Sequence, residues 1–168
     1  HIDQYKPDLV IYTGAHDGRD NVEVKRAETL EIPVLPHGKA LGMAMEGKRQ
    51  ITVAGSHGKT TVTAMIATIL TKAGLDPSYA IGSGMVAGLG LPGHFGRGEW
   101  FVGEGDEYVT DPGHDETPRF LWQKPEILVI TNIDFDHPDV YPDMTAVVAA
   151  FKKLVSQSGT VISGSDDP

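Results

Sequence analysis

The sequence predicts an α/β fold in which a mostly parallel sheet carries a phosphate-binding loop, and two observations lead to that prediction. Short apolar runs alternate with helical stretches, which is the pattern of a parallel sheet covered by helices on both faces. In addition, a glycine-rich turn at residues 55–61 lies between an apolar run at 50–54 and a helical stretch at 60–73. A strand, a glycine-rich turn and a helix in this order form the context of a phosphate-binding loop.

The first 46 residues are expected to contribute two short strands and two helices. In chain order these are a strand at 8–13, a helix at 21–30, a strand at 32–35 and a helix at 37–45. The strands are consecutive apolar residues, and the first helix has apolar residues at positions 22, 24, 27 and 30. A polar break at 47–49 then separates this part from the rest of the chain.

The remaining residues repeat the alternation more regularly. We expect strands at 50–54, 79–81, 100–103, 126–131 and 160–163, and helices at 60–73 and 143–156. The glycine-rich residues 82–98 are predicted to form loops, and the polar residues 109–118 an exposed loop. Right-handed crossovers bring the carboxyl ends of parallel strands to one edge, where such sheets bind ligands. Three candidate motifs lie at those ends, at residues 55–61, 104–107 and 132–137.

The first motif consists of Gly55, Ser56, His57, Gly58, Lys59, Thr60 and Thr61. Its glycines allow a tight turn, and the following helix N-terminus favours negative charge. Lys59 supplies a mobile cation for the β- and γ-phosphates, and the Thr60 hydroxyl can hold Mg²⁺. The common pattern G-x-x-x-x-G-K-[ST] has glycine where Val53 stands, so a purely structural glycine turn is the alternative to a nucleoside triphosphate site.

The other two motifs are rich in carboxylates and follow predicted strands. Glu104-Gly105-Asp106-Glu107 offers three carboxylates, which suit a hard divalent cation. Asn132 opens the third motif, in which Asp136-His137 can hold a second metal ion or orient its water. The alternatives are a solvated acidic turn for the first group and a capping cluster before the helix at Asp143 for the second.

Composition restricts the classes of function. The chain has 168 residues and a formal net charge of −9, which argues against a nucleic-acid-binding surface. It contains no cysteine, which excludes disulfides and thiolate chemistry and is compatible with a reducing cytosol. No apolar run approaches the roughly 18 residues of a membrane span. We therefore expect a cytoplasmic protein without a membrane span or a nucleic-acid partner.

The three motifs together, G-S-H-G-K-T-T, E-G-D-E and T-N-I-D-F-D-H, resemble those of the Mur ligases, and Asp166-Asp167-Pro168 resembles a later motif of that family. The resemblance implies an ATP-dependent amide ligase of peptidoglycan synthesis or recycling. Family members have three domains. By this likeness, residues 1–46 are the end of a Rossmann-like domain that binds the UDP-sugar, and residues 47–168 are part of the central ATPase. The C-terminal domain is absent, so this chain alone is expected to have no ligase activity.

The resemblance also implies cofactors and residue roles. ATP would be held by the loop residues 55–61 together with Asn132, and Mg²⁺ by Thr60, Glu104 and His137. Lys59, Glu104 and His137 would be the catalytic residues. Weaker matches suggest that Thr13 and His16 contact the uridine part of the substrate. Lys152 falls where several relatives carry a carbamylated lysine, and its role is left open.

The segment at 33–39 and the histidine in the phosphate loop resemble the branch that acts on UDP-N-acetylmuramate. Within that branch, one activity adds L-alanine and another adds the tripeptide L-Ala-γ-D-Glu-meso-diaminopimelate. The 28-residue spacing between Glu104 and Asn132 favours the tripeptide activity. Against it, the sequence of residues 109–117 differs from that usual in the tripeptide-adding ligases. The tripeptide activity is our expectation and the L-alanine activity the alternative. A folate-type ligase and a non-catalytic ATP-binding fragment remain as further alternatives, and a GTP-binding switch lacks support because no N-K-x-D motif is found.

Overall fold

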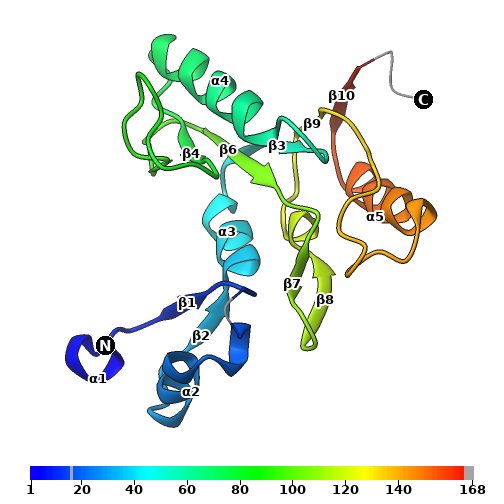
Figure 1. Ribbon diagram of the computed structural model, residues 1–168. Coiled ribbons are helices and arrows are strands. Elements are labelled where there is room, and N and C mark those ends of the chain that lie inside the picture. The colour runs from blue at the N-terminus through cyan, green and yellow to red at the C-terminus, as the bar shows by residue number, and fades with distance from the viewer. Residues whose placement is uncertain (16, 165–168) are drawn as a thin grey trace.

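A computed structural model describes residues 1–15 and 17–164 and shows an α/β fold. The described residues form a two-stranded parallel sheet, a six-stranded sheet and a two-stranded hairpin (Figure 1). His16 and the Asp166-Asp167-Pro168 segment, which the sequence analysis singled out, lie outside the described residues. The mostly parallel α/β sheet predicted from the sequence is confirmed.

The N-terminal lobe contains the two-stranded sheet and lies apart from the larger sheet (Figure 1). Its elements are α1 (Ile2–Tyr5), β1 (Val10–Tyr12), the 3-10 helix η1 (Gly18–Asp20), α2 (Val22–Thr29) and β2 (Val34–Pro36). α3 (His37–Met45) then leads from this lobe to the larger sheet. α1 and η1 were not predicted, because neither is long enough to show a helical period.

The larger part of the chain follows the predicted alternation of strands and helices. Its elements are β3 (Arg49–Ala54), α4 (Lys59–Lys72), β4 (Ser78–Ala80), β5 (Gly93–His94), β6 (Trp100–Gly105), β7 (Val109–Asp111), β8 (Asp115–Pro118), η2 (Arg119–Trp122), β9 (Ile127–Ile130), α5 (Met144–Ser156) and β10 (Thr160–Ser163). The N-cap of α5 is Asp143, where the helix was predicted to start, and its carboxylate accepts a hydrogen bond from Ala146 N at 2.9 Å. That bond satisfies one of the N–H groups that a helix start leaves free.

The strand order of the larger sheet is β10-β9-β3-β6-β4-β5, and all neighbouring pairs are parallel except β4 with β5. β3 pairs with β6 on one side and with β9 on the other. Consequently, the carboxyl ends of β9, β3 and β6 lie next to one another. We call the segments at or directly after these three ends, residues 55–61, 104–107 and 131–137, the rim.

The two faces of the sheet have separate apolar cores. On one face, α4 contributes Ala67, which packs with Ile51 of β3 and Val102 of β6. On the other face, α5 and η2 contribute Phe151 and Phe120, which pack around Leu128 of β9. Residues that alternate along a strand point to opposite faces, so both faces of β3 are buried. This fixes the register of β3 and with it the position of the loop that follows.

The prediction of an exposed loop at 109–118 is wrong. These residues form the β7–β8 hairpin, in which Val109, Thr110 and Asp111 are buried. Thr110 Oγ1 donates a hydrogen bond to Thr117 O at 2.6 Å and accepts one from Trp122 Nε1 at 2.8 Å. The polar composition that suggested solvent exposure instead serves hydrogen bonds within the hairpin and to its neighbours.

The hairpin joins the N-terminal lobe to the rest of the molecule. The Tyr12 hydroxyl donates a hydrogen bond to Asp111 Oδ2 at 3.0 Å, and Lys39 Nζ lies 2.8 Å from Asp115 Oδ2. Asp111 is only 2% exposed, so the Tyr12 hydroxyl supplies a hydrogen bond that its carboxylate cannot take from water. Burial and the neighbouring Asp111 carboxylate raise the pKa of Tyr12 to about 12.

Gly55 is the residue that allows the loop after β3 to pass the end of β9. Its φ is +134°, and a β-carbon there would lie 2.2 Å from Thr131 Oγ1 and 2.7 Å from Asn132 O. A side chain at this position therefore combines a disfavoured backbone conformation with a steric clash.

We predict that Gly55→Ala lowers the free energy of unfolding by about 3 kcal/mol or more, because backbone strain and overpacking add. Gly47→Ala is the matched control, since Gly47 also has a positive φ of +76° but open space within 4 Å of where a β-carbon would lie. The control should cost about 1 kcal/mol, from backbone strain alone. Urea unfolding of both variants measures the difference, and equal losses would contradict the close contact at Gly55.

We also predict that Tyr12→Phe lowers the free energy of unfolding by about 1–3 kcal/mol at pH 7, because a buried carboxylate loses its donor. The pKa of Tyr12 in the folded protein, about 12, lies above its ordinary value of 10.0. The stabilisation is therefore complete below pH 10 and is lost as the pH rises through about 12. Tyr5→Phe, at a residue 71% exposed, is the control and should change nothing. A Tyr12→Phe protein as stable as the wild type would exclude this role.

Candidate functional site

The loop between β3 and α4 presents backbone N–H groups at a helix N-terminus. Gly58 is the N-cap of α4, with a φ of +82°, and the first bond of the helix runs from Val62 N to Gly58 O. The N–H groups of the first turn, from Lys59 to Thr61, precede that bond and have no acceptor within the helix. The loop thus provides the geometry in which helix N-termini bind phosphate oxygens.

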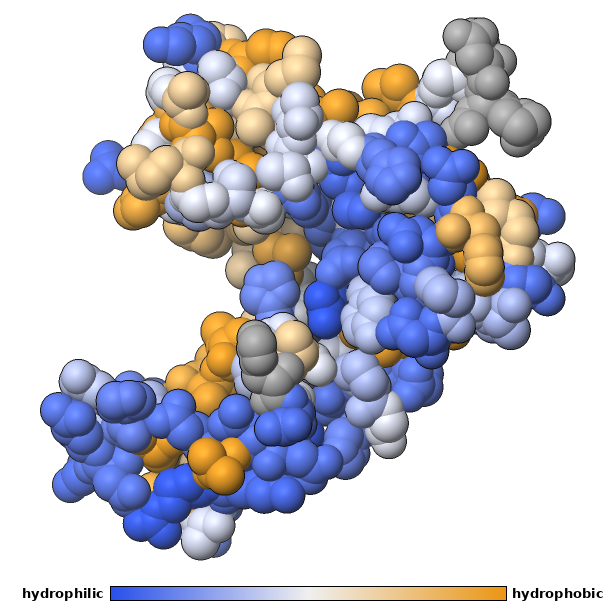
Figure 2. Space-filling view, in the orientation of Figure 1, coloured by the Kyte–Doolittle hydropathy of each residue, from blue (hydrophilic) through white to orange (hydrophobic). Residues whose placement is uncertain are grey.

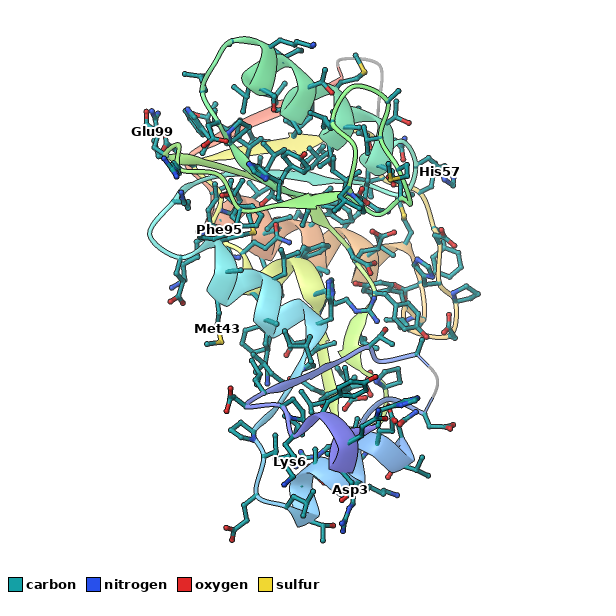
Figure 3. All side chains as sticks on the ribbon, turned by 90° about the vertical axis from the view of Figure 1, so that its left-hand side faces the viewer. Asp3, Lys6, Met43, His57, Phe95 and Glu99 are labelled. Atoms are coloured by element: carbon teal, nitrogen blue, oxygen red, sulfur yellow. The ribbon has the colours of Figure 1, made fainter. Side chains whose placement is uncertain are left out.

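The end of β9 holds this loop in place. Thr131 Oγ1 donates to His57 O at 2.6 Å, and Asn132 Oδ1 accepts from His57 N at 2.9 Å. Ser56 Oγ accepts from Asp134 N at 2.9 Å. The side chain of Asn132 is therefore engaged with the loop backbone, whereas the exposed His57 lies at the outer edge of the molecule (Figure 3). The sequence analysis included Thr131 in the T-N-I-D-F-D-H motif but gave it no role, although a hydroxyl at the end of a buried strand was a usable signal.

Lys59 extends from the first turn of α4 back over the loop. Its ammonium lies 2.6 Å from Gly55 O and 3.0 Å from Glu107 Oε2. The Glu107 side chain is 3% exposed and that of Lys59 17% exposed, so solvent screens this ion pair only weakly. The lysine of the phosphate loop and a carboxylate of the second motif are thus brought into direct contact.

Glu107 also connects the second motif to the third. His137 Nε2 lies 3.5 Å from Glu107 Oε1, and Asp136 Oδ2 lies 3.8 Å from the same His137 nitrogen. Potential ligand atoms of Glu107, Asp136 and His137 all lie within 4.8 Å of one another. The sequence analysis gave metal roles to Glu104 and His137 but none specifically to Glu107. Nothing in the sequence indicated which carboxylate of the tetrad points toward His137.

Glu104 faces the start of α4 from β6. Thr60 Oγ1 donates to Glu104 Oε2 at 3.1 Å, and Gly82 N donates to Glu104 Oε1 at 2.6 Å. A hydroxyl and a carboxylate this close together are the oxygen ligands that Mg²⁺ prefers. The predicted pair of Thr60 and Glu104 is therefore adjacent, and the donor set fits the ion.

A cavity of about 360 Å³ opens beside these residues, between α3 and the rim. Its lining includes Lys59 and Glu104 from the rim, His37 and Gly38 from the start of α3, and Arg119 from η2. Figure 2 shows the molecule hollowed between the N-terminal lobe and the lobe that carries the larger sheet. A ligand in this cavity would contact α3, η2 and the phosphate loop at once.

Two other predicted residues, Thr13 and Lys152, lie outside this group. Thr13 is exposed after β1, and its Oγ1 accepts a hydrogen bond from Ala15 N at 3.3 Å. Lys152 is exposed on α5 beside a shallow groove with Met144 and Val148, and it is not among the residues that line the 360 Å³ cavity. No helix of the described residues is long and apolar enough to cross a membrane.

Sequence and structure comparisons give a consistent result, although no protein-family model matches the chain. A UDP-N-acetylmuramate–L-alanine ligase of Desulfitobacterium hafniense (strain Y51) is 40% identical over 166 residues, which cover 97% of this chain and 35% of that protein. The enzyme of the same name from Aquifex aeolicus (strain VF5) is 39% identical over 163 residues, 95% of this chain and 34% of that protein. The chain thus spans about a third of the length of the curated relatives it matches.

Of the solved structures that are similar over 99% of the chain, two have TM-scores close to 0.8. One is the UDP-N-acetylmuramate:L-alanyl-gamma-D-glutamyl-meso-diaminopimelate ligase from Neisseria meningitides, with a TM-score of 0.82 and 27% identity over 54% of that chain. The other is the UDP-N-acetylmuramate-alanine ligase from Thermotoga maritima, with a TM-score of 0.79 and 30% identity over 37% of that chain. These relatives, the fold and the three motifs agree with one another: the chain belongs to the Mur ligase family.

Proposed function

We propose that this chain carries the ATP site of a ligase that joins L-alanine to UDP-N-acetylmuramate. The observation that carries the proposal is the meeting of Lys59, Glu107 and His137 at the rim, beside the Thr60–Glu104 pair and the 360 Å³ cavity. The choice of L-alanine rests on the names of the relatives at about 40% identity. The sequence analysis favoured the tripeptide, and these relatives favour its alternative.

Amide formation from a carboxylate requires activation, because a carboxylate oxygen is a poor leaving group. In the proposed reaction, a carboxylate oxygen of the muramate attacks the γ-phosphorus of ATP, and ADP leaves. The amine of L-alanine then attacks the acyl phosphate carbon, inorganic phosphate leaves, and the amine proton is released. The first step brings two anions together, so it depends on charge neutralisation and alignment.

The residues of this chain divide that work by position. The N–H groups at the start of α4 bind phosphate oxygens. The Lys59 ammonium moves partly away from Glu107 and contacts the transferred phosphoryl group. Thr60 and Glu104 would hold one Mg²⁺, and His137 with Glu107 and Asp136 a second. Bound Mg²⁺ supplies charge neutralisation during phosphoryl transfer. Asn132 keeps the loop in position through its bonds to His57.

The two lobes have separate parts in this proposal. Residues 1–46 would be the end of a UDP-sugar-binding domain, with Thr13 and His16 near the uridine, and residues 47–168 part of the ATPase domain. The position of the cavity between α3 and the rim supports this division, because a ligand there contacts both parts. Lys152 keeps an open role, since it is exposed on α5.

The tripeptide ligase is the second candidate. The structure from Neisseria meningitides that bears this activity in its name has a TM-score of 0.82, against 0.79 for the alanine ligase from Thermotoga maritima. The β7–β8 hairpin also accounts for the long spacing between Glu104 and Asn132 that favoured the tripeptide in the sequence. Both candidates share the ATP site and the sugar substrate and differ only in the amine.

We predict that Lys59→Ala in the intact protein lowers turnover at least about 100-fold while the fold is kept, because a cation at the transferred phosphoryl group is lost. Lys72→Ala is the matched control, since Lys72 is an exposed lysine in the last turn of the same helix. Initial rates of ADP release measure both variants. A Lys59→Ala protein that works at the control's rate would rule out the proposed role.

We predict that the intact protein, given ATP, UDP-N-acetylmuramate and equal concentrations of both amines, forms mainly the L-alanine product. Mass spectrometry of the product mixture distinguishes the two amides by mass. A mixture dominated by the tripeptide product would select the second candidate. ATP hydrolysis without either product would point instead to the non-catalytic ATP-binding alternative.

A further inference from the structure

Arg119 is the residue that brings the β7–β8 hairpin, the N-terminal lobe and the cavity together. Its β- and γ-carbons lie 3.2 and 3.1 Å from where a β-carbon on Gly38 would be, and its Nη2 lies 3.3 Å from the corresponding position on Gly14. Glycine at both positions leaves room for the arginine side chain, which extends past the start of α3 toward the loop after β1. The side chain is 18% exposed.

The guanidinium of Arg119 is fixed on one side and has free donors on the other. Nε donates to Val109 O at 3.1 Å, and Nη1 donates to Asp106 Oδ2 at 2.6 Å. No hydrogen bond joins Nη2 to any described residue. An arginine has five N–H donors, and a planar guanidinium that is already oriented binds a carboxylate or phosphate oxygen well.

Among the charged residues that line the cavity, Arg119 is the cation best placed to bind an anionic ligand. Lys59 is held by Glu107 and the loop, and Asp106 is already paired with Arg119. His37 lines the cavity too, but burial and the nearby Arg119 charge lower its pKa, which favours the neutral imidazole. Among the described lining residues, Arg119 thus combines a permanent charge with unused donors.

We infer that Arg119 binds the carboxylate of the sugar nucleotide and makes the site specific for a substrate that carries one. This inference rests on the proposed function and adds a specificity-determining residue to it. The carboxylate is the group that must approach Lys59 and Glu104 to accept a phosphoryl group, and those two residues line the same cavity as Arg119. Contact with the oxygen that does not react would orient the other oxygen toward the phosphate loop.

Asp106 acts as the positioning residue for this contact. Its Oδ1 accepts a hydrogen bond from Tyr108 N at 3.0 Å, and its Oδ2 accepts one from Arg119, so the carboxylate links the guanidinium to the backbone after β6. The Arg119 guanidinium also lies 5.4 Å from the centre of the Tyr108 ring. The arginine is therefore oriented before any ligand arrives, which reduces the entropy lost on binding.

The test compares two sugar nucleotides that differ in the carboxylate. Calorimetric titration of the intact protein measures the Kd of UDP-N-acetylmuramate, which carries the lactyl carboxylate, and of UDP-N-acetylglucosamine, which lacks it. We expect Arg119→Gln to raise the first Kd about 10- to 100-fold, as for loss of a charge-assisted hydrogen bond, and to leave the second Kd unchanged. The Kd of ATP should also stay the same.

Two further variants keep the result interpretable. Arg119→Lys retains the charge and most of the packing but not the planar fork, so a smaller rise in the Kd of UDP-N-acetylmuramate is expected even if Arg119→Gln does not fold. Arg49→Gln is the matched control, because Arg49 forms an exposed ion pair with Glu126 at the opposite end of β3. Its two Kd values should equal those of the wild type.

Each other outcome has a definite meaning. Equal loss of affinity for both sugar nucleotides in Arg119→Gln would assign the contact to the diphosphate and overturn the inference. Unchanged binding of both by Arg119→Gln and Arg119→Lys would overturn it as well. A wild-type protein that does not bind UDP-N-acetylmuramate would instead refute the proposed function, and the inference with it.

Discussion

The arrangement of the site depends on the pairing of β3 with β6 on one side and β9 on the other. Because all three strands run in the same direction, their carboxyl ends form one edge, and each supplies a different chemical group to it. The register matters as much as the order. Ala54 is opposite Gly105 and Ile130, so β3, β6 and β9 end at the same level of the sheet. A shift of one residue would turn the side chains of β3 to the wrong face.

The sequence was informative where a local pattern determines structure. Alternating apolar runs predicted the strands of the sheet, and the glycine-rich turn predicted the loop whose Gly55 lies against Thr131. It was not informative where partners are distant in sequence. Glu107 and His137 are 30 positions apart, and only the pairing of β6 and β9 with β3 brings their side chains together. The sequence identified the tetrad E-G-D-E, but it did not show that Glu104 contacts Thr60 whereas Glu107 contacts Lys59 and His137.

The hairpin at 109–118 is a segment whose own composition led to a wrong prediction. Polar residues and two prolines indicated an exposed loop, because hydrophobic periodicity is the main signal for a strand. In the structure, this segment is a hairpin whose first strand is buried, and its polar groups find partners in Tyr12, Lys39 and Trp122. Buried polar groups need hydrogen bonds, and tertiary contacts supplied them here. No property of the segment alone distinguishes that case from solvation.

The Lys59–Glu107 pair places a constraint on how the site can work. A buried carboxylate is costly without a compensating positive charge, and Glu107 is almost completely shielded from water. A phosphoryl group that attracts Lys59 weakens the pair and leaves Glu107 in need of another cation. His137 is close enough to share that carboxylate, and a divalent ion between Glu107, Asp136 and His137 has the required sign and ligands. Under the proposed function, binding of an anionic nucleotide and of a cation at this position are therefore expected to favour each other, because each relieves the charge that the other leaves unpaired.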